Sequence, residues 1–307
     1  MLLHEDKEQF GNLIIAVFEK TGIRRELVEK DYYVTLFLKR LTEKIPTLIF
    51  KGGTSLSKCF HIIERFSEDI DVNVEQADEL TEGGHRRFKQ DVVTAIEELG
   101  LVFVNPENTR SRRDYNKYII DYKPLFGGGV SVKQHLIVES VFRIKCFPTA
   151  EMDAASLIYD YLKENGHDGV IERYELKPFP VTVQSLERTF IDKLFAVCDY
   201  YISGRIEEHS RHFYDLHKIY PRIKIDKRMR ELFEEVRRAR EESDAACPSA
   251  DKGVSVPKLL KEIIEKEIYR RDYEHKTAML LYESVSYGDT VRSLNKIVSE
   301  LEGDAEI

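Results

Sequence analysis

Cysteine is scarce in this sequence, and its spacing excludes the sites that cysteine usually builds. The 307 residues contain four cysteines, Cys59, Cys146, Cys198 and Cys247, and no two of them form a CxxC pair. Such wide spacing is unlike a zinc site or a disulfide framework. We therefore expect all four to be small, buried, apolar side chains in a reducing compartment.

The sequence also lacks long apolar runs and an excess of positive charge. No run approaches the roughly 18 apolar residues of a transmembrane helix. Residues 1–8 have neither the cationic start nor the apolar core of a signal peptide. Together with the cysteines, this predicts a cytoplasmic protein with no membrane partner. The net charge of -8 and the pI of about 5.7 argue against a general nucleic-acid binder, although local basic patches are compatible with them.

The most informative segment begins where a short apolar strand, residues 47–50, is predicted to end. The sequence continues with Lys51-Gly52-Gly53-Thr54-Ser55-Leu56. A Gly-Gly turn lets the backbone and small hydroxyl groups approach a phosphate closely. The candidate phosphate-binding residues are Lys51, Gly52, Gly53, Thr54, Ser55 and, further along, Ser67. The alternative is an ordinary turn, with Lys51 a surface lysine at a strand end.

Two aspartates lie on the next predicted strand, residues 69–74. Asp69 and Asp71 are separated by one residue, so their side chains point to the same side of the strand. Adjacent carboxylates repel each other unless a cation lies between them, and hard oxygen ligands of this kind suit Mg²⁺ or Mn²⁺. The pair therefore predicts a metal site. An isolated Asp-X-Asp is otherwise a solvated strand face or a cap.

The two motifs together are far more specific than either alone. A predicted helix from Ser55 to Arg65 would return the chain to a neighbouring strand, so that loop and acid pair face one cleft and suggest nucleotidyl transfer. At this point the residues resemble the AbiEii/AbiGii abortive-infection toxins, a branch of the polymerase-β-like nucleotidyltransferase superfamily. The matching segments, in order, are Glu29-Lys30-Asp31-Tyr32-Tyr33, Gly52-Gly53-Thr54-Ser55-Leu56, Ser67-Glu68-Asp69-Ile70-Asp71, Thr189-Phe190-Ile191-Asp192-Lys193-Leu194 and Arg211-His212-Phe213-Tyr214-Asp215-Leu216.

This resemblance implies an enzyme that uses a metal ion to move NMP from an NTP to an acceptor. RNA acceptors such as tRNA are known for relatives, and a cognate antitoxin is the implied partner of such a toxin. The resemblance also implies that Lys193 reaches the triphosphate and that Asp215 is an active-site carboxylate with Arg211 nearby. The plainer alternatives are a solvent-exposed Lys193 paired with a nearby acid, and a helix-surface pair of Arg211 with Asp215.

Polymerase-β-like sites usually use a third carboxylate on a neighbouring strand. Glu139, within the apolar segment His135–Val141, is the first candidate, because an acid in such a strand is costly unless it is paired or binds metal. It would otherwise lie on the solvent face, and Asp121 is the competing acid. Glu29, Lys30 and Asp31 match the family, but the residues themselves reveal no chemical role for them. A buried Lys–Asp clamp between helix and sheet is the safer interpretation.

Two other classes of function stay open at this point. A kinase-like phosphotransferase would use the same phosphate loop, and a non-catalytic module would bind a nucleotide or an antitoxin. The intact acid pair, with no Asn or Gln in place of Asp69 or Asp71, argues against the non-catalytic module.

The expected fold class is α+β, with a mixed sheet and flanking helices followed by an all-helical part. Before residue 184, helices are predicted at 6–20, 24–44, 54–65 and 82–99, and strands at 47–50, 69–74, 101–104, 115–122, 132–145 and within 173–183. After it, helices are predicted at 185–203, 208–220, 227–243, 256–269 and 271–301. We therefore expect a nucleotidyltransferase core at 1–184 and a helical domain at 185–307 that completes the active-site cleft. Gly127-Gly128-Gly129 is expected to be a hairpin loop.

Two segments are basic despite the acidic whole. Arg110, Arg112, Arg113 and Lys117 precede or enter a predicted strand, with Tyr115 and Tyr118 interleaved. Residues 205–240 also hold more basic than acidic side chains. Each segment is either an RNA contact, through phosphates and stacked bases, or a solvated charged face.

Overall fold

The computed structural model describes residues 1–67, 69–126, 135–243 and 247–303. Glu68, the Gly127–Gly129 loop and the last residues of the acidic tail lie outside this description. The chain divides into two compact units. Unit 1 comprises Met1–Phe60, Ser67–Phe142 and Thr149–Val183, and unit 2 comprises His61–Phe66, Arg143–Pro148 and Gln184–Ile307. Two short segments from the first half of the sequence therefore fold with the helical second half.

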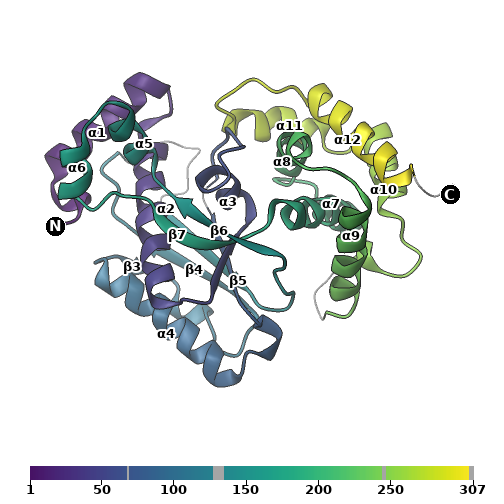
Figure 1. Cartoon of the computed structure of the whole chain (residues 1–307), viewed down its shortest axis with the longest axis horizontal. Helices are drawn as coiled ribbons and strands as arrows, with labels where there is room; N and C mark the ends of the chain where they lie inside the picture. Colours follow the sequence, from purple (N-terminus) through teal and green to yellow (C-terminus); the bar gives the residue numbers. More distant parts are fainter. Residues whose placement is uncertain (68, 127–134, 244–246, 304–307) are drawn as a thin grey trace. The chain divides into compact units, whose positions relative to one another are not determined.

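Unit 1 contains a mixed sheet with helices packed against it (Figure 1). Its helices are α1 (Lys7–Thr21), α2 (Arg25–Lys44), α3 (Gly52–Lys58), α4 (Glu82–Glu98), α5 (Leu157–Glu164) and α6 (Asp168–Arg173). The strands are β1 (Leu48–Lys51), β2 (Asp69–Val74), β3 (Val102–Phe103), β4 (Tyr115–Asp121), β5 (His135–Val141), β6 (Thr149–Ala154) and β7 (Phe179–Gln184). Within the described residues these seven strands form one sheet in the order β3-β4-β5-β2-β1-β7-β6.

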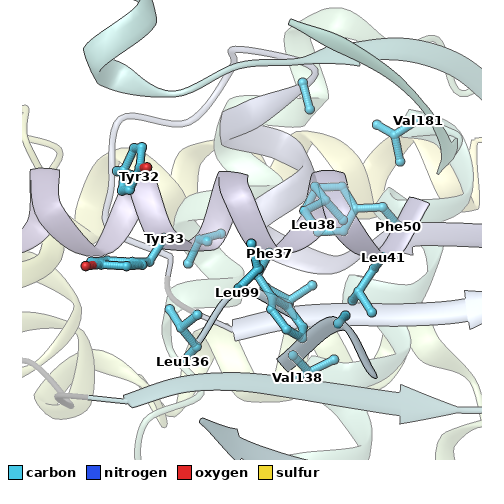
Figure 2. Close-up of a cluster of buried hydrophobic side chains, with 14 of the residues drawn as sticks. Tyr32, Tyr33, Phe37, Leu38, Leu41, Phe50, Leu99, Leu136, Val138 and Val181 are labelled. Carbon is cyan, nitrogen blue, oxygen red and sulfur yellow. The ribbon is translucent and has the colours of Figure 1, made fainter. Parts of the chain in front are cut away.

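The core of unit 1 lies between the sheet and the helices α2 and α4. Alternate residues of the strands, such as Phe50, Val72 and Val138, are buried on this side. Figure 2 shows side chains of α2, including Phe37 and Leu41, directed toward these strand residues. The alternation leaves the opposite side of β2 to Asp69 and Asp71, which are only partly buried.

Unit 2 is helical. Its elements are α7 (Leu186–Ile202), α8 (Arg211–Ile219), α9 (Lys227–Glu241), α10 (Val256–Glu265), α11 (Arg270–His275) and α12 (Tyr287–Glu302). The helix α7 contacts α8, α9 and α10, and fully buried side chains such as Phe195 and Val197 lie on different sides of it. This central helix explains why the segment has apolar residues on more than one side.

Most predicted elements are present, and the expected fold class, a mixed sheet with flanking helices and C-terminal helices, is confirmed. The helix predicted at 54–65 is shorter, since α3 ends at Lys58 and His61 has a positive φ of 52°. The segment that follows is extended, and its Phe66 N–H donates to the Leu280 carbonyl at 2.9 Å while Glu64 accepts from Tyr282 N–H at 2.8 Å. These long-range bonds replace the helical ones.

The sequence also predicted one helix at 271–301, and this is wrong. Helix α11 ends at His275, and α12 begins after Ser286, whose hydroxyl and Asp289 form a reciprocal capping box. The residues between them supply the Leu280 and Tyr282 backbone groups that bond to the extended segment of unit 2. The elements β6, α5 and α6 were not predicted.

The prediction that the cysteines are buried is confirmed. All four cysteines lie in the described part of the chain, and each is free and buried. Among the described residues, no helix is both long enough and apolar enough to cross a membrane.

The Glu29-Lys30-Asp31 segment of α2 has structural contacts. The Lys58 ammonium of α3 lies 2.6 Å from the Asp31 carboxylate, and the other Asp31 oxygen accepts the Leu157 N–H at 2.8 Å. Glu29 is buried and accepts two backbone N–H groups, those of Leu125 and Phe126. A Lys–Asp pair is therefore present, but it joins Asp31 of α2 to Lys58 of α3, helix to helix, and is not the predicted clamp between helix and sheet.

We expect Lys58→Met to lower the free energy of unfolding by about 3 kcal/mol, because it leaves the Asp31 carboxylate, which is only 17% exposed, without its cation. Lys20→Met is the matched control. Its ammonium pairs with Glu164 where both side chains are largely exposed, at 43% and 63%. The control should change stability by less than about 1 kcal/mol. Urea denaturation of both variants measures the difference, and equal small changes would contradict the assigned pair.

Candidate functional site

Charged residues form a row across the side of the sheet in unit 1 that faces away from the core under α2 and α4. In the strand register, Lys51 of β1 lies opposite Asp71 of β2, and Asp71 lies opposite Glu139 of β5. Glu139 in turn lies opposite Lys117 of β4. Residues directly opposite each other in a sheet share a face. The register thus places two carboxylates side by side, with a lysine beyond each of them.

Asp69 adds a third carboxylate to this face, because it lies two residues before Asp71 on β2. Its Oδ1 atom is buried and has no hydrogen-bond partner among the described residues. A buried, unpaired carboxylate oxygen is costly, and such an atom commonly marks an ion or water site. The strand register also distinguishes the two candidates for the third acid. Glu139 lies opposite Asp71, whereas Asp121 lies opposite His135, further along the sheet than Asp69.

The Gly-Gly loop, residues 51–55, leads from β1 into α3, whose first residue is Gly52, and it lies directly against the Asp71 carboxylate. Gly52 has a φ of +77°, and a Cβ atom added to it would lie 2.0 Å from Asp71 Oδ2. Both the backbone conformation and the lack of space therefore require glycine here. The loop and the acid pair, which the sequence predicted as separate motifs, are in contact at this residue.

The hydroxyl groups of the loop have intramolecular partners. Thr54 Oγ1 donates to the Asp69 carbonyl at 2.5 Å and shares a hydrogen bond with Ser67 Oγ at 2.9 Å. Ser55 Oγ donates to the Gly52 carbonyl at 2.9 Å. These bonds fix the loop to β2. A phosphate-binding role for Thr54, Ser55 and Ser67 stays a prediction.

Glu139 has a partner on the neighbouring strand. Its Oε1 accepts a hydrogen bond from Lys117 Nζ at 3.0 Å. Burial, together with the carboxylates of Glu139, Asp71 and Asp69, raises the pKa of Tyr115 above its ordinary value. Tyr115 therefore lies close to this acidic face.

The acidic face fits a divalent cation by the chemistry of its donors. Oxygen ligands on one side of a strand, one of them unpaired, suit Mg²⁺ or Mn²⁺. Among the described residues, however, no three His, Cys, Asp or Glu side chains already converge as a complete set of metal ligands. The ion pair between Lys117 and Glu139 is consistent with this, so Asp69 and Asp71 are the stronger ligand candidates.

A second charged cluster lies in unit 2. Asp215 is fully buried on α8, and Arg65 donates to its two oxygens at 2.6 and 2.8 Å. Lys193 of α7 donates to the same carboxylate at 2.6 Å. Although burial alone would raise the pKa of Asp215, Arg65 and Lys193 hold it below its ordinary value.

This cluster has two buried cations for one carboxylate. Burial lowers the pKa of Lys193; Asp215 opposes this shift, while Arg65 and Arg211 add to it. The structure therefore overturns the alternative of a solvent-exposed Lys193, which is only 6% exposed. The alternative pair of Arg211 with Asp215 is also wrong, because both carboxylate oxygens are bonded to other cations.

Arg65 and Lys58 are the structural residues that sequence reasoning missed. Both were placed inside a predicted helix, where nothing in the local pattern marks a buried cation. Arg65 is 150 residues from Asp215 in the chain, so no helical spacing relates them. Lys193 alone would neutralise Asp215, so the sequence carried no signal for a second cation there.

Comparisons with known proteins agree with this architecture. Residues 36–295 match the model of the family described as nucleotidyl transferase AbiEii toxin, type IV toxin–antitoxin system. Because the match covers most of the chain, the chain belongs to this family of nucleotidyltransferase toxins. The protein is therefore a nucleotidyltransferase, and the family implies an NTP substrate, usually a divalent metal ion, and an antitoxin partner.

The fold is similar to that of a solved structure, MenT4, a nucleotidyltransferase toxin from Mycobacterium tuberculosis H37Rv. The two chains share 19% identity with a TM-score of 0.52, and the match covers 95% of this chain and 90% of that chain. No curated protein matches the sequence.

We expect Gly52→Ala to abolish most nucleotide transfer, because the new methyl group must displace the Asp71 carboxylate. Gly22→Ala is the matched control. Gly22 has a similar φ of 74°, but an added Cβ would meet nothing within 4 Å. Both variants should lose about 1–2 kcal/mol of stability from backbone strain. Transfer assays on the two folded variants separate the effects, and equal activities would contradict the contact with Asp71.

Asp215→Asn should lower the free energy of unfolding by about 3–5 kcal/mol, because two buried cations lose their shared counter-charge. Arg211→Gln should have an effect below about 1 kcal/mol, since Arg211 is not the partner of Asp215. Chemical denaturation monitored by circular dichroism gives both values. A larger loss from Arg211→Gln than from Asp215→Asn would overturn the assignment of Arg65 and Lys193.

Proposed function

We propose that this nucleotidyltransferase toxin uses a divalent metal ion, Mg²⁺ or Mn²⁺, to move NMP from an NTP to an RNA acceptor, most specifically tRNA, in the cytoplasm. The observation that supports it most is the unpaired, buried oxygen of Asp69. This atom lies on the same strand face as Asp71, against which the Gly52 backbone packs. Four reduced, buried cysteines are compatible with a cytoplasmic location.

Asp69 and Asp71 are the residues that would hold the metal ion. When bound, such an ion neutralises the phosphate oxygens of the nucleotide and stabilises the charge that develops during transfer. The two carboxylates stand on one rigid strand in the middle of the sheet, so little ordering is required for binding. Fixing Asp71 against a glycine limits its side-chain freedom further.

Glu139 would act beside this pair as the third carboxylate. It lies opposite Asp71, and it is held by Lys117. From this position it would take the proton of the acceptor hydroxyl or complete the ligand set, and Lys117 would neutralise it while no ligand is bound. The competing acid Asp121 instead accepts the Lys123 N–H, which gives it a local structural role.

The remaining predicted residues have roles that the family resemblance implies. Lys193 would supply positive charge to the triphosphate, with Asp215 orienting it and Arg211 as a further cation. The excess of cations over carboxylates around Lys193 supports an anionic ligand for this lysine, and Arg65 joins the set as the residue that anchors Asp215. Lys51 and the backbone at Gly52 and Gly53 would contact phosphate oxygens.

Transfer of radioactive label tests the reaction class. The purified chain is incubated with total RNA or total protein and with NTP labelled on the α- or the γ-phosphate. We expect the α-label to enter RNA, with tRNA as the main labelled species. A γ-label in the acceptor would show a kinase-like phosphotransferase instead, and an α-label in protein would overturn the RNA acceptor.

The same assay on acid variants tests the site. Asp69→Asn and Asp71→Asn should each lower the transfer rate at least about 100-fold. Losing a residue that only supports a metal ligand already costs up to about 100-fold, and these residues would be ligands themselves. The stability of both variants should hold or rise, because like-charge repulsion is relieved. Asp121→Asn is the control and should stay active, and Glu139→Gln and Lys193→Ala test the other two roles. Near-normal transfer by Asp69→Asn at saturating Mg²⁺ would show that this metal site is misassigned.

A further inference from the structure

A basic pocket outside the acidic face lies in unit 1, where α4 meets the loop before β4. Its cavity has a volume of about 520 Å³. The cationic lining residues are Arg86, Lys89, Arg110, Arg112 and Arg113, and the acidic one is Glu82. We call this the arginine pocket. It stands out in a chain whose net charge is -8.

The cations of the arginine pocket are poorly compensated within the protein. Glu82 lies 3.8 Å from Arg112, but these side chains are 70% and 79% exposed, so the pair contributes little. Arg86 and Arg110 make no salt bridge within the described residues. Like charges gathered in one cavity repel each other, and an anionic ligand would relieve this cost.

The loop that carries three of these arginines is held in place by a buried amide. Asn116 is only 5% exposed, and its Oδ1 accepts the Arg110 N–H at 2.9 Å. Its Nδ2 donates to the carbonyls of Arg110 and Arg113, at 3.1 and 3.2 Å. Lys89 of α4 donates to the Thr109 carbonyl at 2.6 Å and joins the helix to the loop. The backbone of the pocket is therefore ordered before any ligand binds, which lowers the entropic cost of binding.

The chemistry of the pocket favours a chain of phosphates over a single anion. Guanidinium groups bind phosphate through two parallel hydrogen bonds, and five cations around one cavity can contact several phosphates at once.

The loop leads into β4 through Tyr115, which is 47% exposed. Tyr115 and Lys117 are two residues apart on the strand and so share the face that carries Glu139. An exposed aromatic ring between a phosphate-binding loop and an acidic face suits stacking on an unpaired base.

We propose that the arginine pocket binds the sugar–phosphate backbone of the RNA acceptor and guides its unpaired end past Tyr115 toward the acidic face. This inference rests on the proposed transfer to RNA. It corrects the sequence-based expectation in two places, because Tyr118 is buried in the core and Lys117 pairs with Glu139. The proposed phosphate contacts include Arg86 and Lys89 of α4 as well as the three arginines of the loop.

The experiment compares two double variants of the full chain. Arg86→Gln/Arg110→Gln removes two unpaired cations from the pocket. Arg24→Gln/Arg173→Gln removes the same charge from exposed positions of unit 1 that do not line it. The binding probe is a fluorescent RNA hairpin with a single-stranded 3′ end, measured by anisotropy from 50 to 200 mM salt. Transfer of α-label to unfractionated tRNA and binding of NTP are measured on the same proteins.

At 150 mM salt the pocket variant should bind the hairpin roughly tenfold or more weakly than wild type, and its log–log salt slope should be smaller by about 1.4 to 2. Its transfer to tRNA should fall in parallel at limiting tRNA, and its NTP binding should stay unchanged. The control variant should resemble wild type in all three measurements. Poly-glutamate should compete much less well than RNA of the same total charge.

The outcomes separate this inference from the proposed function. If wild type labels tRNA and the pocket variant matches the control, the pocket is not the RNA site, although transfer to RNA stands. If wild type labels no RNA, the proposed acceptor is wrong, and hairpin binding alone then decides whether the pocket holds RNA. Loss of NTP binding in the pocket variant would show that the arginine pocket is a nucleotide site. Equal competition by poly-glutamate would favour an acidic protein segment, and either result overturns the proposal.

Discussion

The repulsion among Asp69, Asp71 and Glu139 is the constraint on which the candidate active site depends. Three carboxylates on one face of a sheet destabilise the fold unless cations compensate them. The protein compensates this face in part with Lys117, whose ammonium is bonded to Glu139. One oxygen of Asp69 has no partner in the described structure. A face arranged in this way favours binding of a cation and, through it, of phosphate.

The Gly-Gly loop matters because it sets the distance between backbone and carboxylate. Gly52 allows the chain to turn with a positive φ and to lie against Asp71 without a side chain in the way. The Thr54 hydroxyl bonds to the Asp69 carbonyl of β2 and the Ser55 hydroxyl to the Gly52 carbonyl, so they hold the loop in shape and against the strand. The loop therefore resembles a rigid support more than a flexible clamp, which suits a site that must hold a reacting phosphate in line.

A cluster in unit 2 has the opposite imbalance of charge, with more buried cations than carboxylates. Arg65 and Lys193 are buried beside a single carboxylate, Asp215, which stays ionised because both cations bond to it. Such a cluster is expensive to desolvate and gives little net stability. Two buried cations beside one carboxylate support the proposed role of Lys193 in binding an anion, and Arg65 holds Asp215 through two hydrogen bonds. The arginine pocket of unit 1 is a third charged feature, and it too has more cations than counter-charges.

The sequence by itself determined the features that depend on neighbouring residues. The two-residue period of β2 put Asp69 and Asp71 on one side, the apolar spacing predicted α1, α2 and α4, and the glycine pair marked the loop. Only the tertiary structure decided which distant residues meet. Arg65 bonds to Asp215 across 150 residues, and Lys117 meets Glu139 through strand register. Residues 61–66 are extended because their backbone bonds to a segment more than 200 residues away, and a local pattern carries no information about such partners.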